Sequence, residues 1–571
     1  MRTRPFSIFC RQIDATQGFP VSYEYSERDV GKTGVVRSRR VRIQRRVAMF
    51  RFLTVTQVGC RRFFPRDLIH RITTLTIFVG LCCVLQLISM QPLRAQSGRR
   101  PNIVLCMADD LGYGDLGFLG NKIVKTPHLD HMAEVGMVFR RFYASSPVCS
   151  PTRGSVLTGR HPYRYRILTA NSGHILKEET TLAELLKDEG YTTGHFGKWH
   201  LGTLTKTKRE SNRGGPRGVK HFAPPWEHGF DYCFSTEAKI PTFDPMLKPK
   251  GIRRKTWWNP ILEKKNATKY GTGYWSNGKE IRENLSGDDS RIVMDRAIPF
   301  IEKAVENRTP FFVIVWFHAP HLPVVADEKH RHLYPNANPY RQNYYGCITA
   351  LDEQMGRLRK TLRDLKVADN TLLCFCSDNG PEGRKGQAPG SAGVFRGRKR
   401  SLYEGGVRVP SIVEWPAKIA GGSSTDFPAS TLDYFPTVVE ALGLAEKVQV
   451  KPLDGVSLLA ILSGKKVQRP KPIPFESGRQ IALSGNRFKL YGKLPTRKKR
   501  RRKQNKNSAK RTKIRQTEIF WELYDLQNDP TESQNLVDRH PEVFKKLKTQ
   551  LLQWRQSYQN SRKGRDYRND E

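Results

Sequence analysis

The sequence predicts an α/β fold, in which helices sandwich a large, mainly parallel or mixed sheet, and a smaller C-terminal α+β subdomain carries an antiparallel sheet. Short continuous apolar runs at 102–107, 310–317 and 371–376 are typical of strands buried on both faces. Helical segments alternate with such strands as far as about Leu444. Beyond about Ser463 the pattern changes to shorter strands and one late helix near 541–558.

The 571-residue chain is long enough for several domains, and its net charge of +44 is unevenly distributed. We expect a basic leader over 1–96, a catalytic α/β domain over 97–460, and the C-terminal subdomain over 461–571. The run 497–515 contains no acidic residue and is predicted to be a solvated basic hairpin insertion. Attraction to polyanions is therefore regional, and we expect no nucleic-acid partner.

The leader contains an apolar run at 72–90, preceded by arginines and followed by small residues. This order resembles a secretory signal with cleavage after Ala95. An uncleaved membrane anchor is the alternative, because the run is nearly long enough to span a bilayer. Met49 is an alternative start. We expect a secreted or periplasmic protein, membrane-anchored only if the leader is not cleaved.

Acidic and amide side chains follow two of the predicted strands. Asp109 and Asp110 come at the end of the first strand, where open α/β sheets bind ligands. Two adjacent carboxylates need compensation, which a hard divalent cation with oxygen ligands provides. Asp378 and Asn379 follow the 371–376 strand and would complete such a site. The alternatives are solvated turns before Gly112 and an Asx turn at Asp378.

Basic and titratable side chains follow two other strands. The predicted strand 191–196 leads to Lys198 and His200, a fixed cation and a titratable base in one turn. The strand 310–317 leads to His318 and His321. For Lys198 and His200, a surface lysine and a packed histidine are the alternative interpretation.

Cys149 stands at the start of a predicted helix over 149–160. Ser150 is a candidate cap, Pro151 suits the first turn, and Gly159 is a candidate stop. A helix start offers free N–H groups and the positive end of the dipole to an anion. The alternative is a buried cysteine before an ordinary helix.

The segment 226–288 is rich in aromatic residues, with basic residues at 253–255. Aromatic faces beside cations would suit a sugar with anionic groups, and packing under a long loop is the alternative. The six cysteines after the leader show no disulfide framework.

In this order, the motifs resemble the type I, formylglycine-dependent sulfatases of the alkaline-phosphatase superfamily, over about 101–535. A softer resemblance, at 235–245 and 284–296, is to sulfatases of polysaccharide-degrading bacteria. The motifs that carry the main resemblance are Asp109-Asp110, Cys149-Ser150-Pro151-Thr152-Arg153, Gly197-Lys198-Trp199-His200, His318-Ala319-Pro320-His321, Asp378-Asn379-Gly380, the stretch 399–410, and Glu522-Leu523-Tyr524-Asp525 with Asn528-Asp529-Pro530.

The resemblance implies that Cys149 is converted to formylglycine (3-oxoalanine) by a formylglycine-generating or an anaerobic sulfatase-maturating enzyme. The hydrated aldehyde would be the nucleophile, and Arg153 would both belong to the maturation signal and hold the modified side chain. One calcium ion (Ca²⁺) is implied, and its ligands would be Asp109, Asp110, the modified Cys149, Asp378 and Asn379.

The same resemblance assigns the remaining catalytic residues. Lys198 and Lys399 would clamp the sulfate. His200 would be the base that collapses the sulfated intermediate, and His321, rather than His318, would assist the leaving group.

The expected function is hydrolysis of sulfate monoesters, with a sulfated carbohydrate as substrate. A phosphatase or phosphonate monoester hydrolase on the same scaffold is the first alternative, since tetrahedral oxyanions present similar charge to a cation and two lysines. A catalytically silent polyanion-binding protein is the second.

Overall fold

The computed structural model describes residues 100–253, 255–495 and 518–567. The leader with its apolar run 72–90, and the basic insertion 497–515, lie outside the described residues. Within the described ranges, no helix is both long and apolar enough to cross a membrane.

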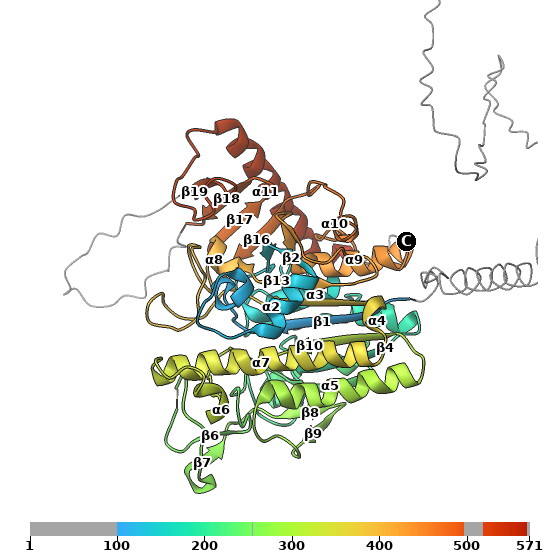
Figure 1. Ribbon diagram of the computed structural model, residues 1–571. Coiled ribbons are helices and arrows are strands. Elements are labelled where there is room, and N and C mark those ends of the chain that lie inside the picture. Colours follow the sequence, from blue (N-terminus) through green and yellow to red (C-terminus); the bar gives the residue numbers. More distant parts are fainter. Residues whose placement is uncertain (1–99, 254, 496–517, 568–571) are drawn as a thin grey trace, which may run out of the picture. The chain divides into compact units, whose positions relative to one another are not determined.

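A large mixed sheet forms the centre of the molecule and confirms the predicted fold class (Figure 1). Strands β11, β1, β10, β4 and β5 are consecutive parallel neighbours, and antiparallel strands flank them. The order of the sheet is β14 (Ser423–Thr425), β2 (Met137–Phe139), β13 (Ser411–Glu414), β11 (Thr371–Ser377), β1 (Asn102–Ala108), β10 (Phe311–Trp316), β4 (Thr192–Lys198), β5 (Tyr232–Thr236), β8 (Tyr274–Ser276) and β9 (Lys279–Ile281).

The central strand β1 is buried along its whole length and contributes to two cores. Ile103, Leu105 and Met107 face one core, and the alternate residues face the other. The first core is closed by α3 (Cys149–Thr158), α4 (Leu182–Asp188), α9 (Tyr434–Ala441) and α10 (Leu459–Leu462). The second is closed by α2 (Pro127–Val135), α5 (Asp289–Glu306) and α7 (Pro339–Asp364), and Figure 1 shows α5 and α7 side by side.

The helix α5 was not expected from the sequence. Asp288 caps it by accepting a hydrogen bond from the backbone N–H of Arg291, and Pro299 stands in its interior. An interior proline normally argues against a helix, so the segment carries a conflicting local signal. Burial of its apolar face, including Ile292 and Ile301, against the sheet outweighs that signal.

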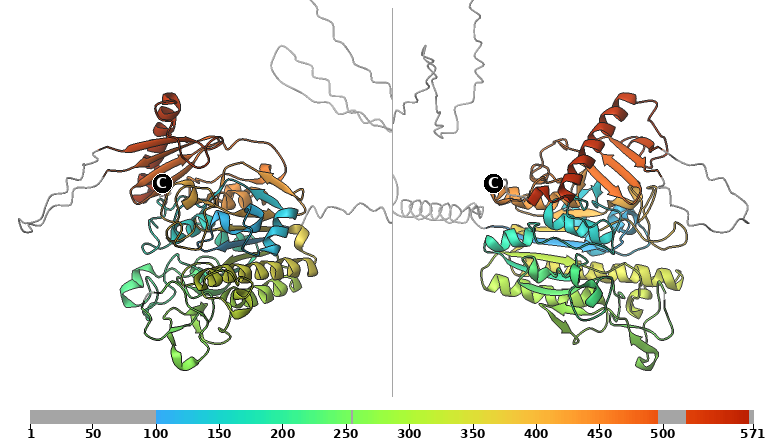
Figure 2. Two further views of the ribbon diagram at one scale, coloured as in Figure 1. Left: turned by 60° about the vertical axis from the view of Figure 1, so that its left-hand side comes forward. Right: turned by 180° about the vertical axis from the view of Figure 1, so that it is seen from behind.

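A second, four-stranded antiparallel sheet follows in the C-terminal part, as predicted. One face packs against the long helix α11 (Pro541–Arg562), as Figure 2 shows, and the other against Tyr143, Leu402, Val407 and Leu432. Its strands are β16 (Ile473–Ser477), β17 (Gln480–Ser484), β18 (Phe488–Lys493) and β19 (Phe520–Asp525). The short helices α6 (Glu328–Arg331) and α8 (Glu404–Val407) complete the α-helices of the described chain.

A buried ionic cluster joins this four-stranded sheet to helix α8. Lys489 on β18 lies 2.8 Å from Glu404 on α8 and 3.0 Å from Glu532, and all three side chains have no exposed surface. The ammonium compensates both carboxylates, and Arg408 also lies 3.4 Å from Glu404. The small sheet is therefore held by charge pairing as well as by its apolar faces.

Candidate active site

The carboxyl ends of five parallel strands meet at one edge of the large sheet and bring the predicted residues together. Because neighbouring parallel strands end at the same edge, side chains far apart in the sequence become neighbours. The strands β11, β1, β10, β4 and β5 deliver Asp378 and Asn379, Asp109 and Asp110, His321, Lys198 and His200, and Lys239, in that order.

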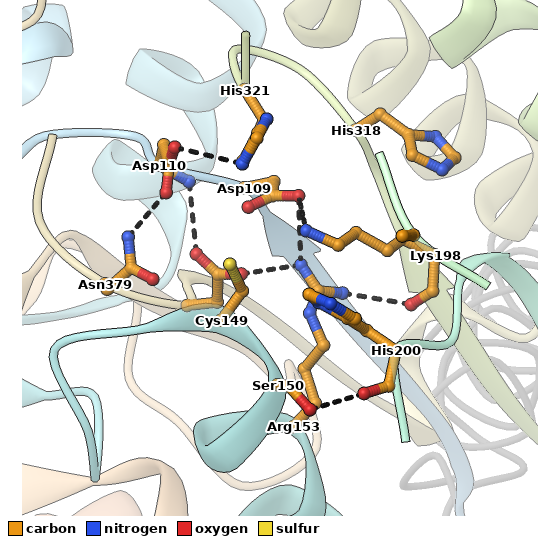
Figure 3. Close-up of polar contacts among 12 residues, drawn as sticks. Asp109, Asp110, Cys149, Ser150, Arg153, Lys198, His200, His318, His321 and Asn379 are labelled. Atoms are coloured by element: carbon orange, nitrogen blue, oxygen red, sulfur yellow. Dashed lines mark hydrogen bonds and ion pairs between the residues drawn. The ribbon is translucent and has the colours of Figure 1, made fainter. Parts of the chain in front are cut away.

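The helix α3 places Cys149 in its first turn, with the thiol buried at this edge. Gly159 ends the helix in the left-handed conformation (φ 67°), as predicted. The prediction that Ser150 caps the helix is wrong, because the cap position is Val148. The Ser150 hydroxyl instead donates to the backbone carbonyl of His200 at 2.5 Å and ties the helix to the end of β4 (Figure 3).

Each predicted lysine is paired with one of the two adjacent carboxylates. Lys198 Nζ lies 2.5 Å from Asp109 Oδ2, and Lys399 Nζ forms an ion pair with Asp110. Lys399 Nζ also lies 3.5 Å from Cys149 Sγ. Lys399 therefore reaches Cys149, Lys198 lines the same pocket, and the charges of both ammonium groups are balanced by carboxylates.

Arg153 forms a buried bridge behind Cys149. Its guanidinium donates to Asp378 Oδ2 at 2.7 Å and to the Lys198 carbonyl at 3.1 Å, and it lies 3.6 Å from Asp109. Figure 3 shows the contact between the Arg153 guanidinium and the Lys198 carbonyl. A planar group with several donors suits this position, since one side chain fixes three segments.

The carboxylate cluster has the composition of a hard-cation site. Within this cluster, three buried oxygens lack a hydrogen-bond partner in the described chain: Asp109 Oδ1, Asp110 Oδ2 and Asn379 Oδ1. Ligand atoms of Asp109, Asp110, Cys149 and His321 all lie within 4.8 Å of one another. Unpartnered buried oxygens of this kind fit a calcium ion, which prefers carboxylate and amide oxygens.

The pKa values in this cluster reflect crowded charge. Burial and the neighbouring Asp109 carboxylate raise the pKa of Asp378 to about 7. Burial also acts to raise the pKa of Asp109, but Lys198, His321 and Arg153 together hold it well below its usual value. A divalent cation would favour the ionised form of both groups.

Two histidines lie in the site with different surroundings. Burial and the neighbouring Lys198 hold the pKa of His200 well below its usual value, so its imidazole is neutral at pH 7. Its Nε2 lies 3.0 Å from Asn212 Nδ2, and its Nδ1 has no partner in the described chain. The Nδ1 of His321 lies 2.7 Å from the Leu322 carbonyl, so this nitrogen carries the proton and Nε2 faces Asp110 at 3.5 Å.

His318 is separate from this group (Figure 3). It is fully buried, with Nδ1 at 2.7 Å from Asp289 and Nε2 at 2.7 Å from Thr236. Of the two histidines that follow β10, only His321 lines the pocket.

A pocket of about 630 Å³ opens over Cys149, Lys198, His200, His321 and Lys399. It also contains residues that the sequence did not point to, because they lie in connections without a periodic pattern or a familiar motif. These are Asn171, Asn212 and Glu382. Lys239 and Arg400 also line the pocket; they lie in the stretches 235–245 and 399–410 that carry the resemblance, but they were not singled out there.

The aromatic residues of 226–288 do not line this pocket in the described chain. Trp258 and Trp275 are buried, Trp257 stacks on Tyr340, and the indole N–H of Trp275 donates to Glu210 at 2.7 Å. The packing interpretation is therefore correct for these residues.

A cysteine at a helix start, beside two lysines and a carboxylate cluster at the edge of a mixed sheet, is the arrangement of an enzyme of the alkaline-phosphatase superfamily. The chain belongs to the sulfatase family, whose family model matches residues 101–444. It is therefore a sulfuric ester hydrolase.

Individual proteins to which the chain is similar agree with this family assignment. The chain is 34% identical over 387 residues to the N-acetylgalactosamine-6-sulfatase of Sus scrofa, covering 65% of this chain and 67% of that protein. It is 30% identical over 434 residues to the steryl-sulfatase of Homo sapiens, covering 65% and 71%. The crystal structure of Ps i-CgsB in complex with k-i-k-neocarrahexaose superimposes with a TM-score of 0.64 and 26% identity, over 80% of this chain and 93% of that one.

Proposed function

We propose that this chain hydrolyses sulfate esters of a carbohydrate, after conversion of Cys149 to formylglycine and with one calcium ion held by Asp109, Asp110, Asp378 and Asn379. The position of Cys149 carries the proposal, since the thiol lies in the first turn of α3, 3.5 Å from Lys399 and inside the carboxylate cluster. A formylglycine-generating or anaerobic sulfatase-maturating enzyme would be the partner that modifies it.

The environment of the thiol supports a modified side chain. Burial raises the pKa of Cys149 despite the nearby lysines, so an unmodified cysteine would remain a protonated, weakly nucleophilic thiol. When present, formylglycine supplies a hydrated aldehyde as nucleophile, and calcium supplies charge stabilisation for the sulfate oxygens.

The protein's own groups would stabilise and position the sulfate. Lys198 and Lys399 hold their ammonium groups beside Asp109 and Asp110, and the start of α3, where Cys149 lies, would add free N–H groups. Arg153 would keep the modified residue, Asp378 and the end of β4 in register. These contacts are fixed before the substrate arrives, which limits reorganisation during the reaction.

The two histidines would move protons. His200 is neutral at pH 7, so its imidazole has one nitrogen able to accept a proton, and it would act as the base at residue 149. Burial lowers the pKa of His321 to about 4 in the free site, and a bound anion beside it would raise that value. Because Nδ1 is held by the Leu322 carbonyl, Nε2 is the nitrogen that would protonate the departing alcohol.

The carbohydrate part of the proposal is supported by the names of two similar proteins, an N-acetylgalactosamine-6-sulfatase and Ps i-CgsB in complex with k-i-k-neocarrahexaose. A steryl-sulfatase is also similar, so the ester's organic part has to be tested directly. A secreted or periplasmic location remains our prediction from the leader sequence.

The deciding experiment compares kcat/KM for an aryl sulfate and the matching aryl phosphate, using matured protein. We expect a clear preference for the sulfate, and a phosphate preference would favour the phosphatase alternative. The Cys149→Ala variant is the control for background hydrolysis. Retention on a sulfated resin without turnover of any sulfate ester would favour the silent polyanion-binding alternative.

A further inference from the structure

Lys239 lines the same pocket as the candidate catalytic residues but lies closer to solvent than they do. It follows β5 by three residues and is exposed on the pocket wall. By contrast, the side chains of Lys198 and Lys399 are 1% and 4% exposed beside Cys149. The pocket therefore carries two buried lysines at its base and a third lysine nearer to solvent.

The loop that carries Lys239 is held in place by buried hydrogen bonds. Thr236 Oγ1 donates to the Ala238 carbonyl at 2.8 Å and lies 2.7 Å from His318 Nε2. His318 is in turn 2.7 Å from Asp289 on α5. On the other side, Glu237 accepts from the backbone N–H of Arg213 at 2.6 Å. These bonds give His318 a positioning role outside the pocket. They also hold the backbone of the loop just before Lys239 in place.

Among the lysines and arginines that line the pocket in the described chain, Lys239 is the one without a carboxylate partner. Lys198 and Lys399 pair with Asp109 and Asp110, and Arg400 forms two contacts with Glu382, at 2.6 and 2.8 Å. Lys239 makes no ion pair with a described residue. Burial, Lys198 and Lys399 together lower its pKa, which shows that it experiences the positive potential at the base of the pocket.

We propose that Lys239 binds a second anionic group of the substrate, a carboxylate or a second sulfate on the sugar that carries the cleaved sulfate or on its neighbour. This inference rests on the proposed function and narrows the substrate class to doubly anionic carbohydrates. The cleaved sulfate would lie beside Cys149, where Lys198 and Lys399 already serve it. Lys239, exposed further out, would contact a different charge, and the amides of Asn171 and Asn212 offer partners for neutral hydroxyls.

The test uses the Lys239→Met variant of matured protein, because methionine keeps an unbranched chain but removes the charge. Two substrate sets are compared: 4-nitrophenyl sulfate with singly sulfated neutral sugars, and the same sugars carrying a second sulfate or a carboxylate. We expect kcat/KM on the doubly anionic set to fall about tenfold or more, mainly through KM, since one partner of a partly desolvated charge pair is lost. On the singly anionic set it should stay within about twofold.

The exposed Lys122, outside the pocket lining, provides the matched control, and Lys122→Met should leave both sets unchanged. An equal loss on both sets would overturn the proposal, because Lys239 would then serve the cleaved sulfate. No loss on either set, or a wild-type preference for the singly anionic sugars, would also overturn it. If the wild-type protein hydrolyses no sulfate ester at all, the proposed function itself fails.

Discussion

Arg153 and Asp378 form an ion pair with no exposed surface, 2.7 Å between Nη2 and Oδ2, which joins the helix of Cys149 to the end of β11. The same guanidinium reaches the Lys198 carbonyl. One side chain therefore connects the proposed nucleophile position, a proposed metal ligand and a sulfate-binding lysine.

Substituting Arg153→Lys should lower kcat/KM by about 100-fold or more, since an ammonium cannot make both contacts and residue 149 would shift. Unfolding in denaturant should show a loss of about 3 kcal/mol, because Asp378 loses a buried partner. The mass of the peptide containing Cys149, taken from the same sample, separates poor positioning from failed maturation. The exposed Arg282→Lys is the control, and near-normal activity of Arg153→Lys would contradict the bridging role.

Removal of calcium should abolish activity and lower the melting temperature, because the carboxylates of Asp109, Asp110 and Asp378 would repel one another. Restoring calcium to about 100 times its Kd should recover about 2.7 kcal/mol of stability. Calorimetry with a chelator and with added calcium measures this shift. The Asp378→Asn variant should show a smaller shift, and Asp295→Asn, at a half-buried carboxylate on α5 outside the cluster, an unchanged one. Full activity in chelator would remove the calcium site.

Lys489→Met should destabilise the fold by about 3 kcal/mol, because Glu532 would be left buried without a cation and Glu404 would keep only Arg408. Lys493, exposed at the end of the same strand, is the matched control. Denaturant unfolding followed by tryptophan fluorescence measures both variants. Equal, small effects would show that the cluster does not hold the C-terminal sheet.

Stability should decrease on acidification below about pH 6.5 through His228. Burial lowers the pKa of His228 to about 4 in the folded protein, whereas an unfolded histidine titrates near 6.5. Between these values the unfolded state binds more protons, so the free energy of unfolding falls by up to about 1.4 kcal/mol per pH unit. Between pH 7.5 and 5, the denaturant midpoint should depend less on pH in His228→Phe than in the wild-type protein. In His332→Phe, whose histidine is 73% exposed, the pH dependence should be unchanged. Parallel curves would contradict the assignment.

The site residues that could be predicted from the sequence are those that lie at the ends of strands. Asp109, Lys198 and Asp378 each follow a buried run directly, so the rule for parallel sheets places them at one edge. Their pairing could not be predicted, because it depends on which strands are neighbours. Lys239 and Asn212 were missed for a related reason, since they lie in connections whose course is set by tertiary contacts.

Local rules failed where tertiary contacts compete with them. Ser150 has the chemistry of a helix cap, but its hydroxyl is used by the His200 carbonyl. The helix α5 tolerates Pro299 because its apolar face is buried against the sheet. The aromatic segment 226–288 looked suited to sugars, yet its tryptophans pack internally.

The most direct test of the account is the mass of the tryptic peptide 142–153, which contains Cys149 and ends at Arg153. In active protein, this peptide should be lighter than the unmodified sequence by the difference between a CH2SH and a CHO group, and the modified fraction should rise in proportion to kcat. Fully active protein whose peptide carries only the thiol mass would contradict the account.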